Sequence, residues 1–169
     1  MADDPSTPTE NLANFTGNDT DENENAVPFL IGAQYIKDLS FENPRGMDAL
    51  SAIQQNPDVS VDVQTNAHPL SEDGMFEVTV FIRAEAALED VPVFIVELTY
   101  SGIVQVSGLQ EDEVKPIVLI EGPRHLFPFA RSIVSNAVRD GGFPPLLINP
   151  IDFASLFIEQ HVDSDGSDI

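Results

Sequence analysis

Three histidines are the side chains best suited to acid–base or metal chemistry in this sequence, and none stands in a known catalytic pattern. His68, His125 and His161 lack a His-Glu-x-x-His spacing, and the chain has no cysteine to complete a metal site. No Gly-x-Ser-x-Gly elbow is present, so a serine nucleophile would lack its usual scaffold. The stretch "SGIVQVSG" has glycines but no phosphate-binding lysine. We therefore predict that the protein is not an enzyme.

Two acidic runs are the remaining candidates for cation binding. "EDE" at 111–113 could hold a cation, but a run of acids in a loop is usually a solvated bend. "DSDGSD" near the end is similar to a calcium loop, but its glycine comes too early and the closing glutamate is missing. We predict no metal and no cofactor.

The net charge restricts the classes of partner. The chain has 169 residues, with 29 acidic and 7 basic side chains and a net charge of -22. Phosphate binding needs clustered Lys and Arg, so nucleic acid and anionic membranes are disfavoured, whereas a basic protein fits. No apolar run approaches the ~20 residues that span a bilayer. The first residues have neither a basic start nor an apolar run, so we expect a cytoplasmic protein without membrane insertion.

The acidic residues divide the chain into three parts. Residues 1–26 contain seven acids and no base, and residues 163–169 are similarly polar. Segments of this composition bury too little apolar surface to offset the entropy lost on ordering. We predict a disordered arm over 1–26, a folded domain over 27–162 and a disordered tail over 163–169.

The folded part begins with strands that alternate apolar and polar residues. "QYIKDLSFE" places Tyr35, Lys37, Leu39 and Phe41 on one side of the first strand. Residues 58–66, 75–86 and 91–108 predict three more strands, with Val59, Val61 and Val63 inward on the second and Phe94, Val96, Leu98 and Tyr100 on one side of the fourth. This order predicts an α+β fold with a four-stranded antiparallel sheet.

Helices are expected between the first two strands and after the fourth. "RGMDALSAIQQNP" favours a short helix, and the apolar spacing from Leu126 to Asp140 predicts a long amphipathic one. Pro128 fits its first turn, and Gly141 with Gly142 would end it. A second helix follows, with Asn149 as its N-cap.

Aromatic residues gather where these elements begin and end. Phe41, Phe129, Phe143 and Phe157 lie at such borders, which favours an apolar surface groove, although any single phenylalanine could equally fill the core. Two groups of acidic and apolar residues lie on the predicted polar side of the sheet: Asp38 and Glu42 on the first strand, and Ile95 with Glu97 on the fourth. These four residues could form a patch for a basic protein, or be ordinary exposed side chains.

Three motifs resemble one family. "LFPFARSIVSNAVRDGGFPPLLINPIDFASLF", "QYIKDLSFENP" and "PVFIVELTYSGIVQVSG" are similar, in order, to the helices, first strand and fourth strand of SecB protein-export chaperones, over about residues 28–160. The resemblance implies a dimer of dimers without catalytic activity that holds unfolded precursor proteins and delivers them to the SecA motor. The family's groove usually has a tryptophan where Gln55 stands here.

The same resemblance assigns roles to individual residues. It implies SecA-binding positions at Asp38, Glu42, Ile95 and Glu97, positions supporting tetramer formation at Val96, Leu98 and Tyr100, and client-binding positions at Phe41, Phe129 and Phe157, with Phe143 as a substitute for the missing tryptophan. Two alternatives stay open: a SecB-like chaperone of a toxin–antitoxin pair, and a small acidic ligand-binding α+β domain.

Overall fold

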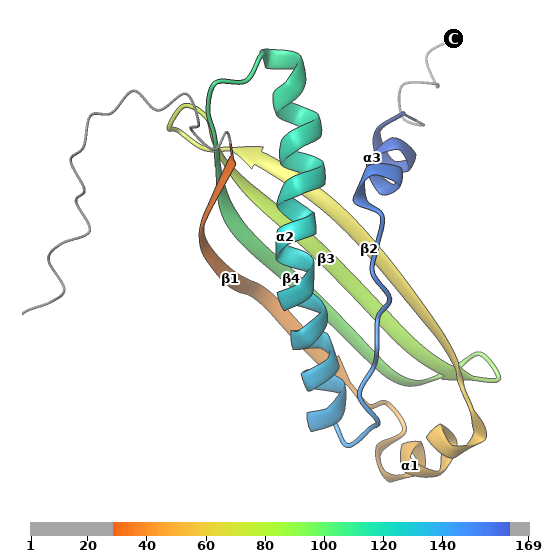
Figure 1. The fold of residues 1–169 in the computed structure, drawn as a ribbon. Coiled ribbons are helices and arrows are strands. Elements are labelled where there is room, and N and C mark those ends of the chain that lie inside the picture. Colours follow the sequence, from red (N-terminus) through yellow and green to blue (C-terminus); the bar gives the residue numbers. More distant parts are fainter. Residues whose placement is uncertain (1–28, 163–169) are drawn as a thin grey trace, which may run out of the picture.

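A four-stranded antiparallel sheet with one long helix across it forms the body of the protein (Figure 1). The computed structural model describes residues 29–162. The strands are β1 (Phe29–Glu42), β2 (Asp58–Pro69), β3 (Met75–Leu88) and β4 (Val91–Val106), in the spatial order β1-β4-β3-β2. The predicted α+β fold is therefore confirmed, whereas the predicted disordered segments 1–26 and 163–169 lie outside the described residues.

The helix-facing side of the sheet carries the hydrophobic core. Alternate residues of β3 and β4 are buried on this side, among them Val80, Ile82, Val96 and Leu98, each with no exposed surface. They lie beneath α2 (Glu111–Asp140), which crosses this face of the sheet in Figure 1. The predicted alternation of both strands is thus confirmed. We call the opposite side of the sheet the outer face.

A bulge in β1 changes the faces predicted for the first strand. The pairing with β4 shifts between Ile36 and Asp38, so Ile36 lies opposite Tyr100 and Leu39 opposite Leu98. Directly opposed residues of an antiparallel pair share a face. Leu39 and Phe41 therefore face the helix as predicted, but Tyr35, opposite Ser101, lies on the outer face. The prediction for Tyr35 and Lys37 was wrong because one extra residue reverses the alternation.

The link between β1 and β2 contains the short helix expected there. α1 (Ala49–Ala52) lies between two short 3-10 turns and buries Ala49 and Ala52 at one end of the sheet. The Arg45 guanidinium fixes this link by donating hydrogen bonds of 2.9–3.2 Å to the carbonyl oxygens of Leu88, Val91 and Pro92. These carbonyls belong to the turn between β3 and β4, so the link is held against that turn.

The long helix α2 begins fifteen residues before the predicted start. Residues 111–113, expected in a solvated bend, form its first turn, where acids interact favourably with the helix dipole. The Glu113 side chain accepts a 3.0 Å hydrogen bond from the Gln110 backbone N–H and so closes the N-terminus. Pro116, Pro123 and Pro128 all lie inside the helix, which is why the sequence pattern pointed to a later start.

The last helix, α3 (Phe153–Val162), also begins later than predicted. Its N-cap is Asp152 and not Asn149: the Asp152 carboxylate accepts hydrogen bonds from the backbone N–H groups of Ala154 and Ser155 at 3.0 and 3.3 Å. The Ser155 hydroxyl adds the largest contribution to lowering the pKa of Asp152. Phe153 is buried and packs edge-on against Phe127, with ring centroids 5.5 Å apart. This contact fixes α3 beside α2.

Candidate functional site

The four predicted docking residues lie together on the outer face. Glu42 is opposite Ile95, and Glu97 is opposite Ser40 one step further along the same two strands. Asp38 lies opposite Thr99 on the same side. Asp38 and Glu42 are exposed, and Ile95 and Glu97 are half-buried. The structure therefore brings all four residues into one acidic surface with an apolar centre.

A basic residue within this acidic surface was missed in the sequence. Arg83 of β3 lies opposite Glu97 and forms ion pairs with Glu97 and, at 2.9 Å, with Glu85. The hydrogen bonds that the Arg83 guanidinium donates to Glu97, and then to Glu85, raise its pKa. The strand alternation of β3 could have placed Arg83 on the outer face, but only the register places it beside Glu97.

A second polar group on the outer face links β1 to β3. The Tyr35 hydroxyl donates a hydrogen bond to one carboxylate oxygen of Glu77, and Lys37 Nζ lies 2.9 Å from the other. The bond from Tyr35 has the largest effect in lowering the pKa of Glu77, and the same bond raises the pKa of Tyr35. The β1 bulge makes this contact possible, since it puts Tyr35 and Lys37 on the outer face.

The four predicted client-binding phenylalanines do not form one groove. Phe41 and Phe143 lie together beyond the end of α2, with ring centroids 5.9 Å apart, and both pack against Phe94. Phe143 is only 3% exposed, so it packs against Phe41 within the core and cannot contact a client in this conformation. Phe129 is 54% exposed on α2, and Phe157 is half-buried on α3.

The predicted tetramer positions lie inside the single chain. Val96, Leu98 and Tyr100 are buried on the helix-facing side of β4, with 7% or less of their surface exposed. These three side chains therefore cannot contact another subunit directly in this conformation. Any influence of these residues on assembly would act through the position of α2, and their role stays a prediction.

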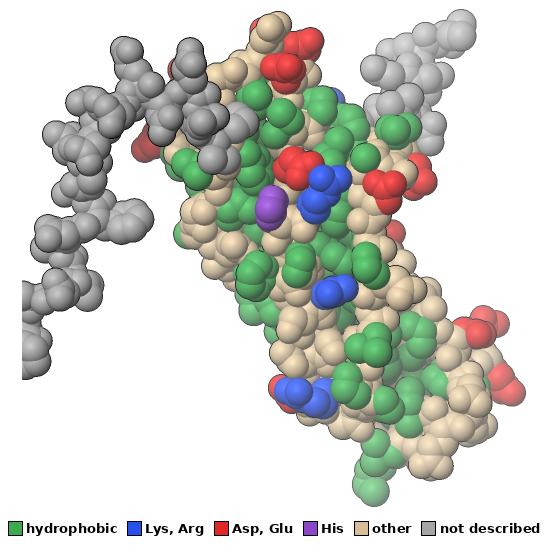
Figure 2. Space-filling view, viewed as in Figure 1, with side chains coloured by type: hydrophobic (Ala, Val, Ile, Leu, Met, Phe, Trp, Pro, Cys, Tyr) green, Lys and Arg blue, Asp and Glu red, His purple; other side chains and the backbone are tan. Residues whose placement is uncertain are grey.

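Several apolar residues at the margins of the sheet are more exposed than the sequence indicated, including Val59 and Val61, which were predicted to face inward. Ile36 and Leu39 on β1 and Val59 and Val61 on β2 face the helix side of the sheet but are left uncovered at its two margins. Leu147 and Ile158 are exposed near α3. Figure 2 shows hydrophobic side chains along the whole length of this face, with most of the visible acidic side chains near its edges. The alternation predicted the correct faces but not how far the helices reach.

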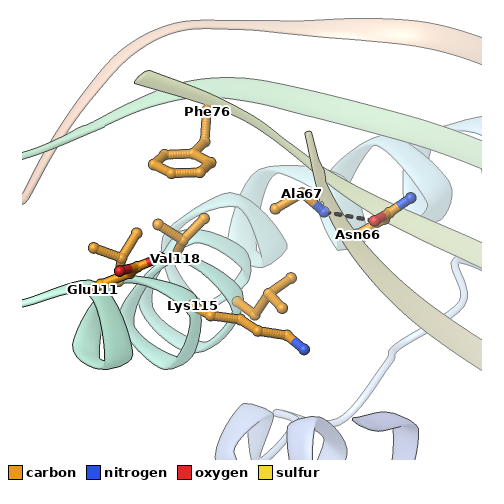
Figure 3. A pocket seen from close by; sticks show the side chains of 8 residues that line it. Asn66, Ala67, Phe76, Glu111, Lys115 and Val118 are labelled. Carbon is orange, nitrogen blue, oxygen red and sulfur yellow. Dashed lines mark hydrogen bonds between the residues drawn. The ribbon is translucent and has the colours of Figure 1, made fainter. Parts of the chain in front are cut away.

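Two hollows accompany this apolar surface. One of about 430 Å³ lies between the ends of β2 and β3 and the first turns of α2, lined by Phe76, Val118 and Lys115 among others (Figure 3). The other, of about 490 Å³, lies between α2 and the link to α3, where Arg131 and Leu147 line it. Both are open surface hollows, unlike the enclosed pockets of most small-molecule sites.

The histidines do not combine with other groups into a chemical site within the described part of the chain. His125 stacks on Phe29 with ring centroids 5.6 Å apart, and His68 contacts Asn66. Among the described residues no group of three His, Asp or Glu side chains is placed to hold a metal ion. No helix within residues 29–162 has the length and apolar character needed to cross a membrane.

Fold and surface together define a class: an α+β domain with an exposed apolar face on the helix side and an acidic outer face. The family model described as Preprotein translocase subunit SecB matches residues 22–164. The Protein-export protein SecB of Azorhizobium caulinodans is 48% identical over 149 residues, covering 88% of this chain and 91% of that protein. The protein of the same name from Xanthobacter autotrophicus is 46% identical over 147 residues, covering 86% and 93%.

The chain belongs to the SecB family of protein-export chaperones, a family of chaperones and not of enzymes. Among solved structures it resembles a Mycobacterium tuberculosis SecB-like chaperone in complex with a peptide from the HigA1 antitoxin, with a TM-score of 0.58 and 13% identity, covering 73% of this chain and 88% of that one. That likeness confirms the SecB-like fold. The resemblance first indicated by the sequence motifs is therefore confirmed.

Proposed function

We propose that this chaperone acts in the cytoplasm as a holdase that binds unfolded precursor proteins and delivers them to the SecA motor. In this proposal it assembles as a dimer of dimers, binds clients on the apolar helix side, and docks through the outer face. Membership of a family of protein-export chaperones supports the proposal. The single observation that carries it is the exposed apolar surface around Phe129, which has no role in the core of the subunit.

The client surface lies along the flank of α2 that faces β1. His125, one turn before Phe129, stacks on Phe29 of β1, and Gly141 lies against the Phe41 ring at the other end of that flank. Between these contacts, Ile36 and Leu39 are exposed on the same side of the sheet. Aromatic and aliphatic surfaces of this kind bind many sequences, because apolar contacts have little directional preference.

Affinity at one such surface is modest. At about 25 cal/mol per Å², burial of about 200 Å² of apolar surface contributes about 5 kcal/mol before the client's ordering entropy is subtracted. Four chains bound along one client would raise the affinity through effective concentration without any new type of contact. The assembly is therefore part of the proposed mechanism.

Docking to SecA is assigned to Asp38, Glu42, Ile95 and Glu97. Glu97 is already paired with Arg83, and this pair is partly exposed to solvent. Exposed ion pairs contribute about 0–1 kcal/mol, so a basic group of a partner can replace Arg83 at little cost. The surface then combines charge, which speeds encounter, with the apolar Ile95, which adds burial.

A toxin–antitoxin role is the second candidate, because the M. tuberculosis neighbour is bound to an antitoxin peptide. That chain is 13% identical, whereas the export chaperones are 41–48% identical over most of this chain. The export role is therefore favoured. The alternative of a small acidic α+β domain that binds a ligand has less support, since both hollows are open to solvent.

The holdase role is tested by suppression of aggregation of a denatured client. We expect Phe129→Ala to weaken protection while the assembly mass and the urea midpoint change little, because Phe129 is largely exposed. Phe143→Ala is the matched comparison: its ring is buried, so it should cost about 3–5 kcal/mol of unfolding free energy. Full protection by the Phe129→Ala variant would contradict the proposed client surface.

A further inference from the structure

The free edge of β2 carries main-chain groups that side-chain amides already occupy. Gln160 of α3 accepts a hydrogen bond from the backbone N–H of Thr65 at 3.4 Å and donates one to the carbonyl of Val63 at 3.2 Å. One amide group thus satisfies one donor and one acceptor on the strand. An added antiparallel strand would satisfy the same two groups with the N–H of one residue and the C=O of the residue two positions away. Gln160 therefore occupies the place of two main-chain hydrogen bonds of a fifth strand.

These bonds show which residues of β2 point their main chain away from β3. Successive residues of a strand alternate in the direction of their N–H and C=O groups. Because the main-chain N–H and C=O groups of Val63 and Thr65 point away from β3, those of Val59, Val61 and Ala67 do so as well. The Ala67 N–H is covered by Asn66 Oδ1 at 2.8 Å, the dashed contact in Figure 3. Side-chain amides thus form hydrogen bonds with the main chain along the edge from Val63 to Ala67.

The other half of the edge is open. Among the described residues no side chain pairs with the outward main-chain groups of Val59 and Val61. The side chains of these two residues are 50% and 40% exposed on the helix-facing side. Apolar side chains and unpaired main-chain groups therefore meet at the same stretch, which is the combination that favours strand addition.

The regularity of β2 favours this edge over that of β1. β2 pairs with β3 without a break from Asp58 to Pro69, whereas the pairing of β1 shifts twice, after Ile31 and after Ile36. A strand added to a regular edge can form consecutive pairs of hydrogen bonds, and each shift interrupts such a ladder. The β2 edge is consequently the better template.

We propose that an extended segment of an unfolded client adds to β2 as a fifth strand, pairing first with Val59 and Val61 and then displacing the Gln160 amide. The inference rests on the proposed holdase function. Gln160 lies in the last turn of α3, so its release leaves the contact between Phe153 and Phe127 in place.

The two faces of β2 indicate the chemistry of the segment. The side chains of Val59 and Val61 face the helix side. Those of Asp58, Ser60 and Asp62 face the outer side. A client strand placed beside them is best matched by apolar residues alternating with basic ones. If the client strand is antiparallel, like every other pair in this sheet, directly opposed residues share a face and exchange their hydrogen bonds. The apolar residues opposite Val59 and Val61 would then direct their own N–H groups at β2.

A synthetic peptide of alternating valine and lysine tests the proposal through its backbone. Titration of the full-length protein with three peptides compares the parent, a version N-methylated on its valine amides and a version N-methylated on its lysine amides. We expect valine methylation to weaken binding about tenfold or more, since it removes the bonds to β2, and lysine methylation to have an effect of less than about threefold.

The protein side of the same test uses Val61→Pro and Val61→Ala. Proline removes an N–H that points away from β3 and so leaves the β2–β3 ladder intact, while alanine shortens the side chain and keeps the N–H. We expect Val61→Pro to bind the parent peptide about tenfold more weakly than Val61→Ala does. Assembly mass and circular dichroism of both variants check the fold.

The outcomes separate this inference from the holdase proposal. If denatured clients are held but the two methylated peptides bind equally, or the parent peptide does not bind, strand addition is overturned and the holdase role stands. Failure to hold denatured clients at all overturns both. A change in assembly mass on Val61→Pro, with no peptide binding by the parent protein, would assign the edge to a second copy of the chain and likewise overturn the proposal.

Discussion

At the scale of single residues, exposure decides which predicted sites can contact a partner. Phe129 and Phe143 have the same chemistry and similar sequence contexts, yet one is largely exposed and the other is buried. The sequence predicted that these aromatic residues lie at element borders; Phe41 and Phe143 do, but Phe129 lies in the interior of α2 and Phe157 lies within α3. It could not rank their exposure, because this depends on how Phe41, Phe94 and Phe143 pack against one another across three separate segments.

Docking at the outer face makes a prediction for Glu97. Glu97→Lys places a second cation beside Arg83 and removes one acid from the surface, so binding to SecA should weaken by about tenfold or more while client holding persists. Equilibrium binding at two salt concentrations measures the effect. Glu72→Lys, an equal charge change in the exposed turn between β2 and β3, is the control. Equal loss of docking and client holding would contradict two separate surfaces.

The contact of Glu77 with Tyr35 and Lys37 makes stability depend on pH. These hydrogen bonds lower the pKa of Glu77 below its ordinary value of 4.5 in the folded state. A group with a lowered folded pKa stabilises fully above its unfolded pKa and loses this effect as the pH falls through the folded pKa. We expect Glu77→Gln to destabilise the protein most above about pH 4.5, with the difference shrinking in more acid solution.

Urea unfolding of both proteins from neutral pH to about pH 3.5 measures this difference. Glu72→Gln serves as the control, since no hydrogen bond to its carboxylate is found among the described residues. A difference between wild type and Glu77→Gln that stays constant across this range would show that Glu77 acts by packing and not by its charge.

At the scale of elements, the position of α2 on the sheet depends on glycines of β4 and of α2 itself. A Cβ added at Gly102 would lie 2.6 Å from Leu126 Cδ2, well inside contact distance. Gly122 approaches Val78 in the same way, at 3.0 Å. The helix can therefore lie close to the sheet only where side chains are absent. This close packing sets the position of the flank of α2 that faces Ile36 and Leu39 on β1.

Gly102→Ala tests this packing. We expect the added methyl group to displace Leu126 and to cost about 1–3 kcal/mol of unfolding free energy, with weaker client binding because the flank of α2 moves. Gly32→Ala on β1 is the control, since its nearest neighbour would be an ordinary 3.7 Å from the new atom. Similar unfolding free energies for the two variants would contradict the close approach of α2.

The elements were predicted in type and order but not at every boundary. Alternation in β3 and β4 and the spacing from Leu126 onward are strong local signals, and the structure confirms them. Pro116 and Pro123 concealed the first half of α2, because interior prolines usually end a helix. The bulge in β1 leaves no comparable signal, since it follows from pairing with β4 and not from the residues of β1 alone.

At the scale of the whole molecule, charge and apolar surface are complementary. A chain with exposed apolar residues along one face would tend to aggregate, and a net charge of -22 opposes this by repulsion between molecules. The family and its general role could be inferred from the sequence motifs. The arrangement of subunits could not, because the residues assigned to assembly by the resemblance are buried within one chain.

The most direct test of this account is the solution mass of the protein by light scattering, with and without a denatured polypeptide. We predict a particle of four chains of 18.4 kDa, about 74 kDa, which gains the mass of the client when an unfolded chain is added and not when the same chain is folded. A particle of a single chain, or a tetramer whose mass is unchanged by unfolded polypeptide, would contradict it.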